Sequence, residues 1–503
     1  MASYLFDLIA SRIPAQDKVF IETPEGGKIT YGDLMSGSAR IANALASLGV
    51  VPGDRVAVQV EKSPEAILLY LACLRTGGVF LPLNTAYTPN EIEYFLSDAK
   101  PKVFVCDPAS REKLNAVAAA AGAAIETLGV RQDGSLMDKA KSQPVTFKDV
   151  DRGKDDLAAI LYTSGTTGRS KGAMLTQNNL ASNALTLVDY WRFTRDDVLI
   201  HALPIYHTHG LFVAMNTLLL AGGSMFFLPK LDADAIMKLM PRATSMMGVP
   251  TFYTRLLQHP GLNRDATKHM RLFISGSAPL LAETHREWRE KTGHAILERY
   301  GMTETNMNTS NPFDGDRVAG TVGFPLPGVS ARIADPDSGK VLPQGEIGMI
   351  EVKGPNVFKG YWQMPDKTKA EFRDDGFFIT GDLGKIDERG YIHIVGRGKD
   401  LVITGGFNVY PVEVESEIDA LPGVVESAII GLAHPDFGEG VTAVVVPQKG
   451  AQIDEKQVMA ALDGRLAKFK LPKKVIFVEE LPRNTMGKVQ KAALRDTYAG
   501  LYK

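Results

Sequence analysis

The most informative stretch of the chain reads Tyr162-Thr163-Ser164-Gly165-Thr166-Thr167-Gly168-Arg169-Ser170-Lys171-Gly172. It follows the apolar run 157–161, which is typical of a buried strand. The glycines let the backbone turn N–H groups toward an anion, the hydroxyls add donors, and Lys171 adds a positive charge. The pattern therefore suits a polyphosphate. Its spacing departs from the common phosphate loop, and a loop of this composition is by itself more often a plain surface turn.

Strands and helices alternate before and after this loop. Val56–Val60 reads as a strand, and Ser63-Pro64-Glu65 then predicts the capped start of a helix. Further strands are predicted at 79–83 and 103–106, and the same alternation recurs from 198 to 277. Such alternation predicts an α/β fold with doubly wound sheets that are covered by helices on both faces.

The last third of the chain has a different pattern. Short strands separated by Gly, Pro and Asp turns predict a small antiparallel barrel or sandwich at about 320–396. A compact α+β segment follows, in which we expect helices at about 411–421 and 454–467. We therefore expect a large N-terminal domain at residues 1–396 and a smaller, mobile C-terminal domain at 397–503.

Composition limits the class of protein. The 503 residues are 45% hydrophobic and 23% charged, which is ordinary for a globular chain. The net charge of −2 gives no general attraction to nucleic acid or anionic lipid, so no nucleic-acid partner is expected. Cys73 and Cys106 lie in apolar runs, as core thiols do. Because the chain shows no secretory signal and no apolar stretch long enough to cross a bilayer, we expect a cytoplasmic protein without a membrane span.

Three other segments carry polar groups that suit a nucleotide. The run 298–305 places the carboxylate of Glu304 among hydroxyls, and Mg²⁺ prefers one or two carboxylates together with phosphate oxygens. Gly276-Ser277-Ala278-Pro279 forms a tight turn after an apolar run, where open α/β sheets bind ligands. Thr380-Gly381-Asp382-Leu383-Gly384 offers an acid for ribose hydroxyls. Taken alone, Glu304 is as often a solvated residue, and Asp382 is more often a turn residue.

Together these segments resemble the acyl-adenylating superfamily of acyl-CoA synthetases, peptide-synthetase adenylation domains and luciferases. The resemblance covers essentially the whole chain and includes the runs 74–83 and 405–411. It implies that the chain binds ATP, that Glu304 and Thr167 bind Mg²⁺, and that the Thr303 hydroxyl donates to the α-phosphate. The residues implied for ATP and AMP are Thr163, Ser164, Gly165, Thr166, Thr167, Gly168, Lys171, Gly276, Ser277, Ala278, Tyr300, Gly301, Asp382 and Arg397.

Lys488 lies near the C-terminus, where lysines are usually mobile surface charges. The resemblance implies instead a catalytic loop whose lysine bridges the substrate carboxylate and the α-phosphate. A cation there offsets the repulsion between two anions in the transition state. The same resemblance places a hinge at Lys399 and the tunnel for a thiol at Gly405 and Gly406. Coenzyme A is then the expected acceptor, with a free carrier protein as the alternative.

Arg299 indicates which acid is used. An apolar acyl chain gains nothing from a buried guanidinium, which is costly to desolvate unless it is paired. A second carboxylate would satisfy it bidentately, whereas pairing with a structural acid such as Glu298 is the alternative. The runs 298–304 and 203–211 resemble malonyl-CoA synthetases, which implies that Met302 and His207 also line the acid pocket. A packed core histidine is the alternative for His207.

The function implied by the resemblance is the ligation of malonate to coenzyme A through a malonyl-adenylate, with AMP and pyrophosphate as products. Alternatives are a synthetase for methylmalonate, acetate or an aromatic acid, an enzyme that loads a carrier protein, and a luciferase-like oxygenase. A non-enzymatic ATP-binding module is a further alternative, against which Lys488 and Glu304 argue. Because related synthetases are switched off by acetylation of the matching lysine, a lysine acetyltransferase and a deacetylase acting on Lys488 are expected partners.

Overall fold

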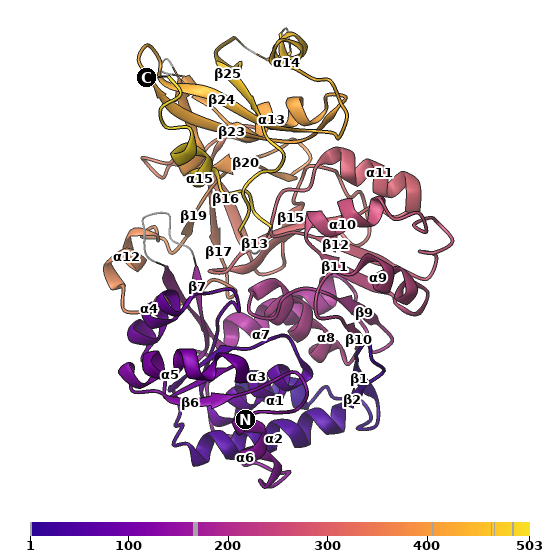
Figure 1. The fold of residues 1–503 in the computed structure, drawn as a ribbon, viewed down its shortest axis with the longest axis vertical. Helices are drawn as coiled ribbons and strands as arrows, with labels where there is room; N and C mark the ends of the chain where they lie inside the picture. The colour runs from indigo at the N-terminus through magenta and orange to yellow at the C-terminus, as the bar shows by residue number, and fades with distance from the viewer. Residues whose placement is uncertain are drawn as a thin grey trace.

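The structure is a computed structural model that describes residues 3–163, 170–404, 407–463, 465–466, 468–484 and 487–502. Figure 1 shows the early part of the chain, in indigo and purple, at one end of the molecule and the last hundred residues, in orange and yellow, at the other. Seven predicted site residues lie outside the described residues, namely Ser164, Gly165, Thr166, Thr167, Gly168, Gly405 and Gly406.

The first sheet contains the strand that leads into the predicted phosphate loop. Its strands are β3 (Arg55–Gln59), β4 (Val79–Pro82), β5 (Val103–Cys106), β6 (Ala124–Thr127), β7 (Leu157–Thr163), β8 (Lys171–Thr176) and β18 (Gly360–Tyr361). They lie in the order β18-β8-β7-β4-β3-β5-β6. The pairs β18–β8 and β8–β7 are antiparallel, and the five strands from β7 to β6 are parallel to one another. The strands predicted from the apolar runs before residue 162 are confirmed.

The second sheet is larger and follows the same parallel pattern. Its strands are β1 (Val19–Glu22), β2 (Lys28–Thr30), β9 (Val198–His201), β10 (Ser224–Phe227), β11 (Ser245–Gly248), β12 (Leu272–Ser275), β13 (Leu297–Met302), β14 (Asn306–Ser310) and β15 (Phe324–Pro325). The order is β15-β14-β13-β12-β11-β9-β10-β1-β2, and the six strands from β13 to β1 are parallel.

Helices connect the parallel strands and cover the faces of both sheets (Figure 1). They are α1 (Tyr4–Ala10), α2 (Tyr31–Ser47), α3 (Pro64–Thr76), α4 (Pro89–Ala99), α5 (Arg111–Ala120), α6 (Ser135–Lys141), α7 (Gln177–Tyr190), α8 (Asn216–Ala221), α9 (Ala233–Leu239), α10 (Pro250–Leu257) and α11 (Ala282–Thr292). Two short 3₁₀ turns are η1 (Pro108–Ser110) and η3 (Met240–Arg242), and η2 (His209–Met215) is a π-helix. The start of α3 follows the predicted cap, because Ser63 Oγ accepts from the Ala66 N–H at 3.2 Å.

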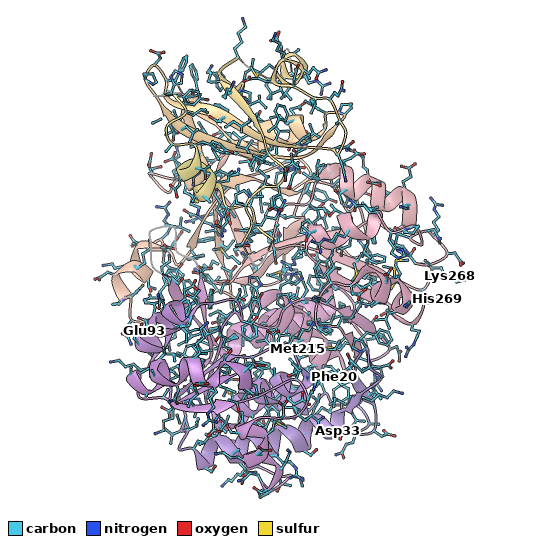
Figure 2. All side chains as sticks on the ribbon, viewed as in Figure 1. Phe20, Asp33, Glu93, Met215, Lys268 and His269 are labelled. Atoms are coloured by element: carbon cyan, nitrogen blue, oxygen red, sulfur yellow. The ribbon has the colours of Figure 1, made fainter. Side chains whose placement is uncertain are left out.

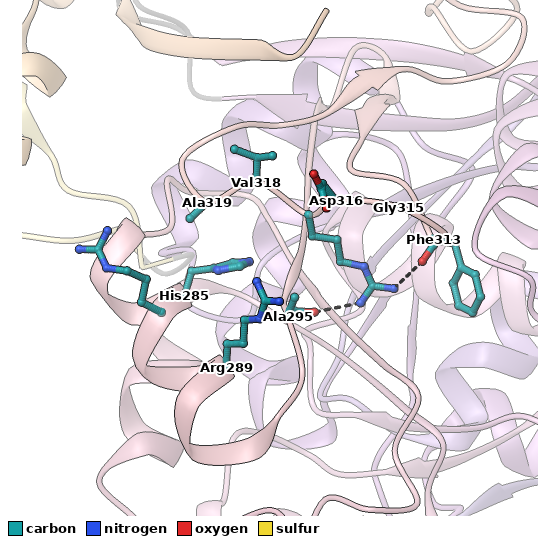
Figure 3. A pocket seen from close by; sticks show the side chains of 10 residues that line it. His285, Arg289, Ala295, Phe313, Gly315, Asp316, Val318 and Ala319 are labelled. Carbon is teal, nitrogen blue, oxygen red and sulfur yellow. Dashed lines mark hydrogen bonds between the residues drawn. The ribbon is translucent and has the colours of Figure 1, made fainter. Parts of the chain in front are cut away.

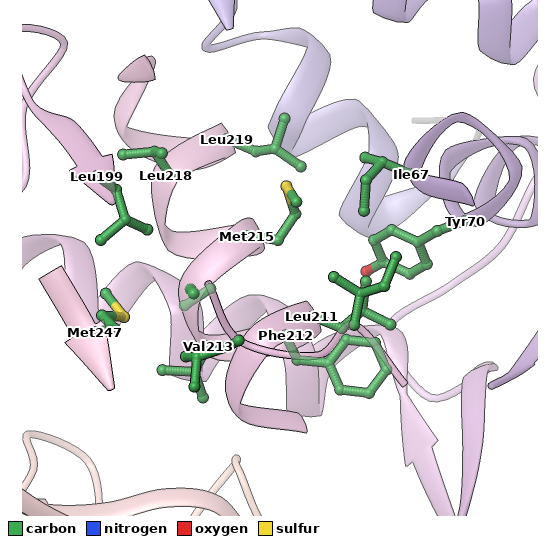
Figure 4. Packing of buried hydrophobic residues seen from close by; sticks show 14 of the residues in the cluster. Ile67, Tyr70, Leu199, Leu211, Phe212, Val213, Met215, Leu218, Leu219 and Met247 are labelled. Carbon is green, nitrogen blue, oxygen red and sulfur yellow. The ribbon is translucent and has the colours of Figure 1, made fainter. Parts of the chain in front are cut away.

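One hydrophobic core joins the two large sheets. Ile67 and Tyr70 of α3 face Phe212 and Met215 of η2 in this core (Figure 4). The rings of Tyr70 and Phe212 lie 5.9 Å apart between centroids. Figure 2 shows Phe20 and Met215 inside the molecule, whereas charged side chains such as Lys268 lie at its edge. The core therefore holds η2 firmly against α3, and η2 begins beside the predicted acid pocket.

A third, antiparallel sheet occupies the region predicted to be β-rich. It contains β16 (Ser330–Ala334), β17 (Gly348–Lys353), β19 (Phe378–Ile386) and β20 (Ile392–Arg397), in the order β16-β17-β19-β20, and α12 (Pro365–Ala370) lies beside β18. The register pairs Asp382 with Arg397. Two residues predicted for the ribose site are thereby brought together.

The C-terminal segment folds around the fourth sheet, after η4 (Gly398–Asp400). The sheet contains β21 (Val402–Thr404), β22 (Phe407–Val409), β23 (Val424–His434), β24 (Gly438–Pro447) and β25 (Lys474–Phe477), and its other elements are α13 (Pro411–Asp419), α14 (Glu455–Leu462), η5 (Lys468–Lys470) and α15 (Lys491–Thr497). The β21–β22 hairpin exposes Ile403 and Phe407, at 53% and 55% of their surface. The fold class predicted from the sequence, large α/β sheets with a smaller α+β C-terminal domain, is confirmed.

Both cysteines are free and buried, as their apolar surroundings predict. Among the helices of the described residues, none is both long and apolar enough to cross a membrane.

Candidate active site

Most of the predicted site residues line one cavity of about 1520 Å³. Its walls come from the ends of β7, β12 and β13, the start of β8, and the loop before α15. The predicted residues in the lining are Thr163, Lys171, His207, Ser277, Arg299, Gly301, Met302, Thr303, Glu304, Arg397, Lys399 and Lys488. Four predicted residues, Gly276, Ala278, Tyr300 and Asp382, are not part of the lining.

The strand β13 supplies side chains to two parts of the site. Successive residues of a strand point to opposite faces, so Arg299 and Tyr300 diverge. Tyr300 donates its hydroxyl to Asp382 Oδ2 at 2.5 Å, whereas the Arg299 guanidinium lies against the backbone of Gly276. A register shift in the pairing of β13 with β14 follows at Tyr300/Gly301. This strand therefore connects the predicted ribose and acid pockets.

Arg299 is a buried cation without a carboxylate partner among the described residues. It is only 3% exposed, and its Nε and Nη2 atoms have no hydrogen-bond partner there. Desolvation lowers the pKa of Arg299 to about 9, so the guanidinium remains charged at neutral pH. Glu298, the alternative partner named from the sequence, instead accepts from the Gly320 N–H at 3.3 Å. The guanidinium thus faces a cavity with unused donors.

Two histidines lie beside this guanidinium. His207 Nδ1 accepts from the His209 N–H at 3.3 Å, and His209 Nδ1 lies 3.2 Å from Ser277 Oγ. Burial lowers the pKa of His207 to about 3, and the charges of Lys488 and Arg299 act in the same direction. Burial also lowers the pKa of His209 well below its ordinary value, with the charge of Arg299 acting in the same direction, so both rings are neutral at physiological pH.

Asp382 is held from two sides. Besides the Tyr300 hydroxyl, Arg397 Nε contacts Asp382 Oδ1 at 2.7 Å. The coulombic attraction of Asp382 raises the pKa of Arg397 above its ordinary value. The Asp382 carboxylate is thus fixed in orientation just behind the lining of the cavity.

Two residues that the sequence analysis did not identify, Tyr361 and Glu371, join the phosphate and magnesium residues. The Tyr361 hydroxyl lies 3.0 Å from Glu304 Oε1 and 3.1 Å from Glu371 Oε2. Lys171 Nζ lies 3.2 Å from Glu371 Oε1. No spacing in the sequence could reveal these contacts, because Tyr361 is 57 residues from Glu304 and Lys171 is 200 from Glu371.

The environment of Glu304 fits a magnesium ion that is shared with a nucleotide. Within the described residues, no group of three or more His, Cys, Asp or Glu side chains could hold a metal by itself. Glu304 is buried, and desolvation raises the pKa of its carboxyl above the ordinary value. A buried carboxylate on a polar cavity gains from a cation, and Mg²⁺ usually binds one or two carboxylates together with phosphate oxygens.

Lys488 is delivered to the cavity by a tight turn. The Lys488 N–H donates to Asn484 Oδ1 at 2.9 Å, and Arg483 Nη1 donates to the Gly487 carbonyl at 2.6 Å. Gly487 has a φ of +75°, which favours glycine. Desolvation lowers the pKa of Lys488, with Arg397 acting in the same direction and Asp382 and Glu304 in the opposite one. The ammonium therefore lies among the groups that sequence analysis assigned to the nucleotide.

A second cavity, of about 580 Å³, lies beside α11 and contains none of the predicted residues (Figure 3). Arg317 lies in its wall but donates to three backbone carbonyls, those of Ala295, Pro312 and Phe313. Arg286 pairs with Glu283 at the surface. Since Arg317 and Arg286 already have partners and none of the predicted site residues lies in this cavity, the larger cavity is the better candidate for the active site.

Comparison with known protein families gives two matches. The model of the AMP-binding enzymes matches residues 10–362, and the model of the C-terminal domain of AMP-binding enzymes matches residues 413–488. The first match alone spans more than half of the chain.

Individual relatives agree with this family. A malonate–CoA ligase of Arabidopsis thaliana is 34% identical over 527 residues, with 95% of this chain and 86% of that protein covered. A feruloyl-CoA synthase of an Amycolatopsis species is 37% identical over 475 residues, with 93% and 94% covered. Overall identity therefore does not decide between these two acids.

Among solved structures, ATP-bound MatB from Rhodopseudomonas palustris is 70% identical over the full length of both chains, with a TM-score of 0.98. Its apo form is equally identical, also over the full length of both chains, but gives a TM-score of 0.87. The arrangement seen here is thus closer to the ATP-bound form.

Proposed function

Because the chain belongs to the family of AMP-binding enzymes, we propose that it is a malonate–CoA ligase that works through a malonyl-adenylate. In the first half-reaction, one malonate carboxylate attacks the α-phosphorus of ATP, the bond to the β-phosphate oxygen breaks, and pyrophosphate leaves. In the second, the coenzyme A sulfur attacks the acyl carbon, the thiol proton passes to solvent, and AMP leaves. The products are malonyl-CoA, AMP and pyrophosphate.

The first half-reaction uses the cations and donors of the large cavity. We assign Lys488 to the space between the attacking carboxylate and the α-phosphate, where its charge offsets the repulsion between two anions. Thr303 donates to the α-phosphate, and Lys171, with the loop Thr163–Gly168, holds the β- and γ-phosphates. When bound, Mg²⁺ neutralises phosphate charge, and Glu304 would hold it, with Thr167 as the second proposed ligand. Support comes from the shared cavity of Lys171, Thr303, Glu304 and Lys488.

The nucleoside is held at the opposite side of β13. We assign Asp382 and Arg397 to the ribose hydroxyls and the segment Gly276–Ala278, with Gly301, to the adenine. Besides its place in the nucleotide site, Tyr300 orients the ribose acceptor in this proposal, because its hydroxyl donates to the Asp382 carboxylate. A fixed acceptor loses less conformational entropy when the ribose binds.

The observation that carries malonate as the acid is the buried Arg299 with unused donors. Malonate has a second carboxylate, which would pair with the guanidinium while the first reacts. An aromatic or aliphatic monoacid would leave the same charge buried and unpaired, at a cost of several kcal/mol, on the order of 3–5. Met302 and His207 line the same cavity.

A panel of acids tests this assignment. Malonate, methylmalonate, acetate, ferulate and benzoate are each incubated with ATP and coenzyme A, and AMP release and the mass of the thioester are measured. We expect malonate to give the highest kcat/KM. Arg299→Ala should lower kcat/KM for malonate by roughly two to three decades, since loss of a buried charge-assisted pair costs about 2–5 kcal/mol. Activity with acetate should fall much less.

Thermal unfolding of the same variant provides the control. An unpaired buried charge costs free energy because it has lost its hydration. Arg299→Ala removes this cost, so the variant should unfold at the same or a higher temperature than the wild type. A lower unfolding temperature together with equal losses for malonate and acetate would show that Arg299 is structural.

An aromatic acid is the second candidate, because the feruloyl-CoA synthase is slightly more similar in overall sequence than the plant malonate–CoA ligase. The panel decides between them directly. Highest kcat/KM for ferulate or benzoate would replace malonate in this proposal and leave the two half-reactions unchanged.

The second half-reaction requires a different position of the C-terminal domain. We propose that residues 397–503 rotate about Lys399 after adenylation, which withdraws Lys488 and brings Gly405 and Gly406 of the β21–β22 connection to the cavity as the thiol tunnel. The different TM-scores for the ATP-bound and apo forms of one relative support such mobility. Coenzyme A is the acceptor in this proposal, and a carrier protein is the alternative.

We also propose that the enzyme works in the cytoplasm and that a lysine acetyltransferase and a deacetylase control it at Lys488. Acetylation removes the ammonium charge that adenylation needs. Lys488 lines the cavity in the arrangement described here, so a modifying enzyme would reach it after the proposed rotation has withdrawn it.

A further inference from the structure

The phosphate and magnesium residues of the proposed site come from different sheets. Lys171 begins β8 of the first sheet, whereas Glu304 follows β13 of the second. A triphosphate with its metal ion needs a cation and a carboxylate at a fixed separation. Some element must therefore set the distance between these two side chains before the nucleotide arrives.

Tyr361 stands between them. It lies in β18, which pairs with β8 so that Tyr361 is opposite Ala173. The side chain is 2% exposed and packs edge-on against the ring of Phe358 at 4.8 Å. The Phe358 N–H donates to the Glu304 carbonyl at 2.7 Å. The short strand is thus attached to both sheets.

The Tyr361 side chain contacts both functional groups of the pair. Its hydroxyl has a single hydrogen, which is shared between Glu304 Oε1 at 3.0 Å and Glu371 Oε2 at 3.1 Å. Lys171 Nζ lies 4.2 Å from the centre of the Tyr361 ring, a favourable distance for a cation–π contact.

Glu371 completes the connection on the lysine side. Its Oε1 lies 3.2 Å from Lys171 Nζ and 2.7 Å from Lys367 Nζ. Burial acts to raise the pKa of Glu371, but the hydrogen bonds and charges of the two lysines together outweigh it and lower the pKa, so this carboxylate is ionised at neutral pH. Tyr361 and Glu371 together form a chain of contacts from Lys171 to Glu304.

We propose that Tyr361 is a positioning residue for the nucleotide, and that its hydroxyl orients Glu304 and, through Glu371, Lys171 for a metal-bound triphosphate. This inference rests on the proposed adenylating function but not on the identity of the acid. Preorganised groups lose less entropy when the ligand binds. The hydroxyl should therefore matter most for the complex of nucleotide and metal.

The variant Tyr361→Phe tests this role, because it keeps the ring packing and the cation–π contact and removes only the hydroxyl. Calorimetry measures the Kd of ATP with Mg²⁺ and with EDTA, in the absence of any acid. We expect Tyr361→Phe to weaken binding of ATP with Mg²⁺ about three- to tenfold, the usual effect of one hydrogen bond, and to weaken binding with EDTA less. In a Glu304→Gln background the same change should have little further effect.

Tyr391→Phe is the matched control. Its hydroxyl donates to the Asp316 carbonyl at 2.7 Å, it is also buried, and it lies outside the large cavity. This variant should bind ATP as the wild type does. Conversion of supplied acyl-adenylate and coenzyme A to thioester should be unchanged in Tyr361→Phe, because this step involves no triphosphate.

Three results would overturn the positioning role. These are an unchanged Kd for ATP with Mg²⁺, an equal loss with Mg²⁺ and with EDTA, and a parallel loss of the thioester step. Since no acid enters the binding experiment, failure of malonate in the acid panel leaves its outcome unaffected.

Discussion

At the scale of single residues, Glu298 and Arg299 occupy neighbouring positions of β13 and yet form no ion pair with each other. Strand alternation sends the two side chains to opposite faces. Arg299 reaches the cavity, whereas Glu298 is buried against the Gly320 N–H. Burial raises the pKa of Glu298 to about 8. The pKa of each residue is therefore set by its own surroundings and not by the other residue.

Glu298 makes a prediction about stability and pH. Because its folded-state pKa of about 8 lies above that of an unfolded carboxyl, folding binds a proton between those two values. The free energy of unfolding should therefore fall by roughly a few kcal/mol as pH rises from about 5 to about 9. Glu298→Gln, a neutral residue of the same shape, should flatten this slope. Urea unfolding of both proteins at pH 6 and pH 9 measures the change in the free energy of unfolding with pH. An identical change in the wild type and in Glu298→Gln would contradict the raised pKa of Glu298.

The residues recognised from the sequence are those in short motifs. Glu304 and Lys171 each belong to a local run whose residue types suit metal or phosphate, the role of Lys488 comes from the resemblance of its run to a family, and all three line one cavity. Tyr361 and Glu371 have no such motif. Their positions depend on the pairing of β18 with β8, which joins segments far apart in the chain and leaves no local pattern.

At the scale of elements, local signals predicted starts better than ends. Ser63 and Pro64 gave the start of α3, and the helix ends before Gly77, whose φ is +72°. The helix expected at 454–467 ends at Leu462, because Asp463 adopts extended backbone. The pair Asp463-Gly464 is a stop signal at that end, but the apolar spacing that continues past it leads to the longer expected helix. Such boundaries depend on packing against neighbouring elements.

The turn that carries Lys488 makes the second prediction. Because Arg483 and Asn484 fix this turn, the lysine is supplied as one part of a separate catalytic element. Lys488→Ala should slow the formation of malonyl-adenylate, measured as pyrophosphate release, by about 10²-fold or more. The enzyme should still convert supplied malonyl-adenylate and coenzyme A to thioester. Acetylated Lys488 should behave in the same way.

Two outcomes would weaken this view of the element. Pyrophosphate release at near wild-type rate would show an incidental surface lysine. Loss of both half-reactions would show that the alanine variant disturbs the C-terminal segment as a whole, which a comparison of unfolding temperatures would detect.

At the scale of the whole molecule, the site is assembled from two large sheets and a C-terminal segment. The alternation of strands and helices predicted the sheets, but not their order, because order depends on contacts between strands distant in sequence. The TM-score of 0.98 with the ATP-bound relative, against 0.87 with its apo form, shows that the arrangement of the chain is closer to the ATP-bound one. In the function that we propose, this arrangement is the one that serves the first half-reaction.

Lys399 supplies the third prediction. It lies in η4 between the third and fourth sheets, and proline fits the first turn of such a helix while fixing φ. Lys399→Pro should retain pyrophosphate release and lose most thioester formation, roughly tenfold or more, because rotation requires a change of φ or ψ. Lys399→Ala, which keeps backbone freedom, is the control. A parallel fall of both half-reactions in the proline variant would contradict the hinge.

The exposed hairpin β21–β22 has a thermal consequence. Ile403 and Phe407 meet water in the arrangement described here, and the proposed rotation would cover them at the cavity. Covering apolar surface is driven by release of ordered water, a force that weakens on cooling. Cold should then favour the adenylating arrangement over the thioester-forming one. An enzyme of this design would accumulate its acyl-adenylate as the temperature drops.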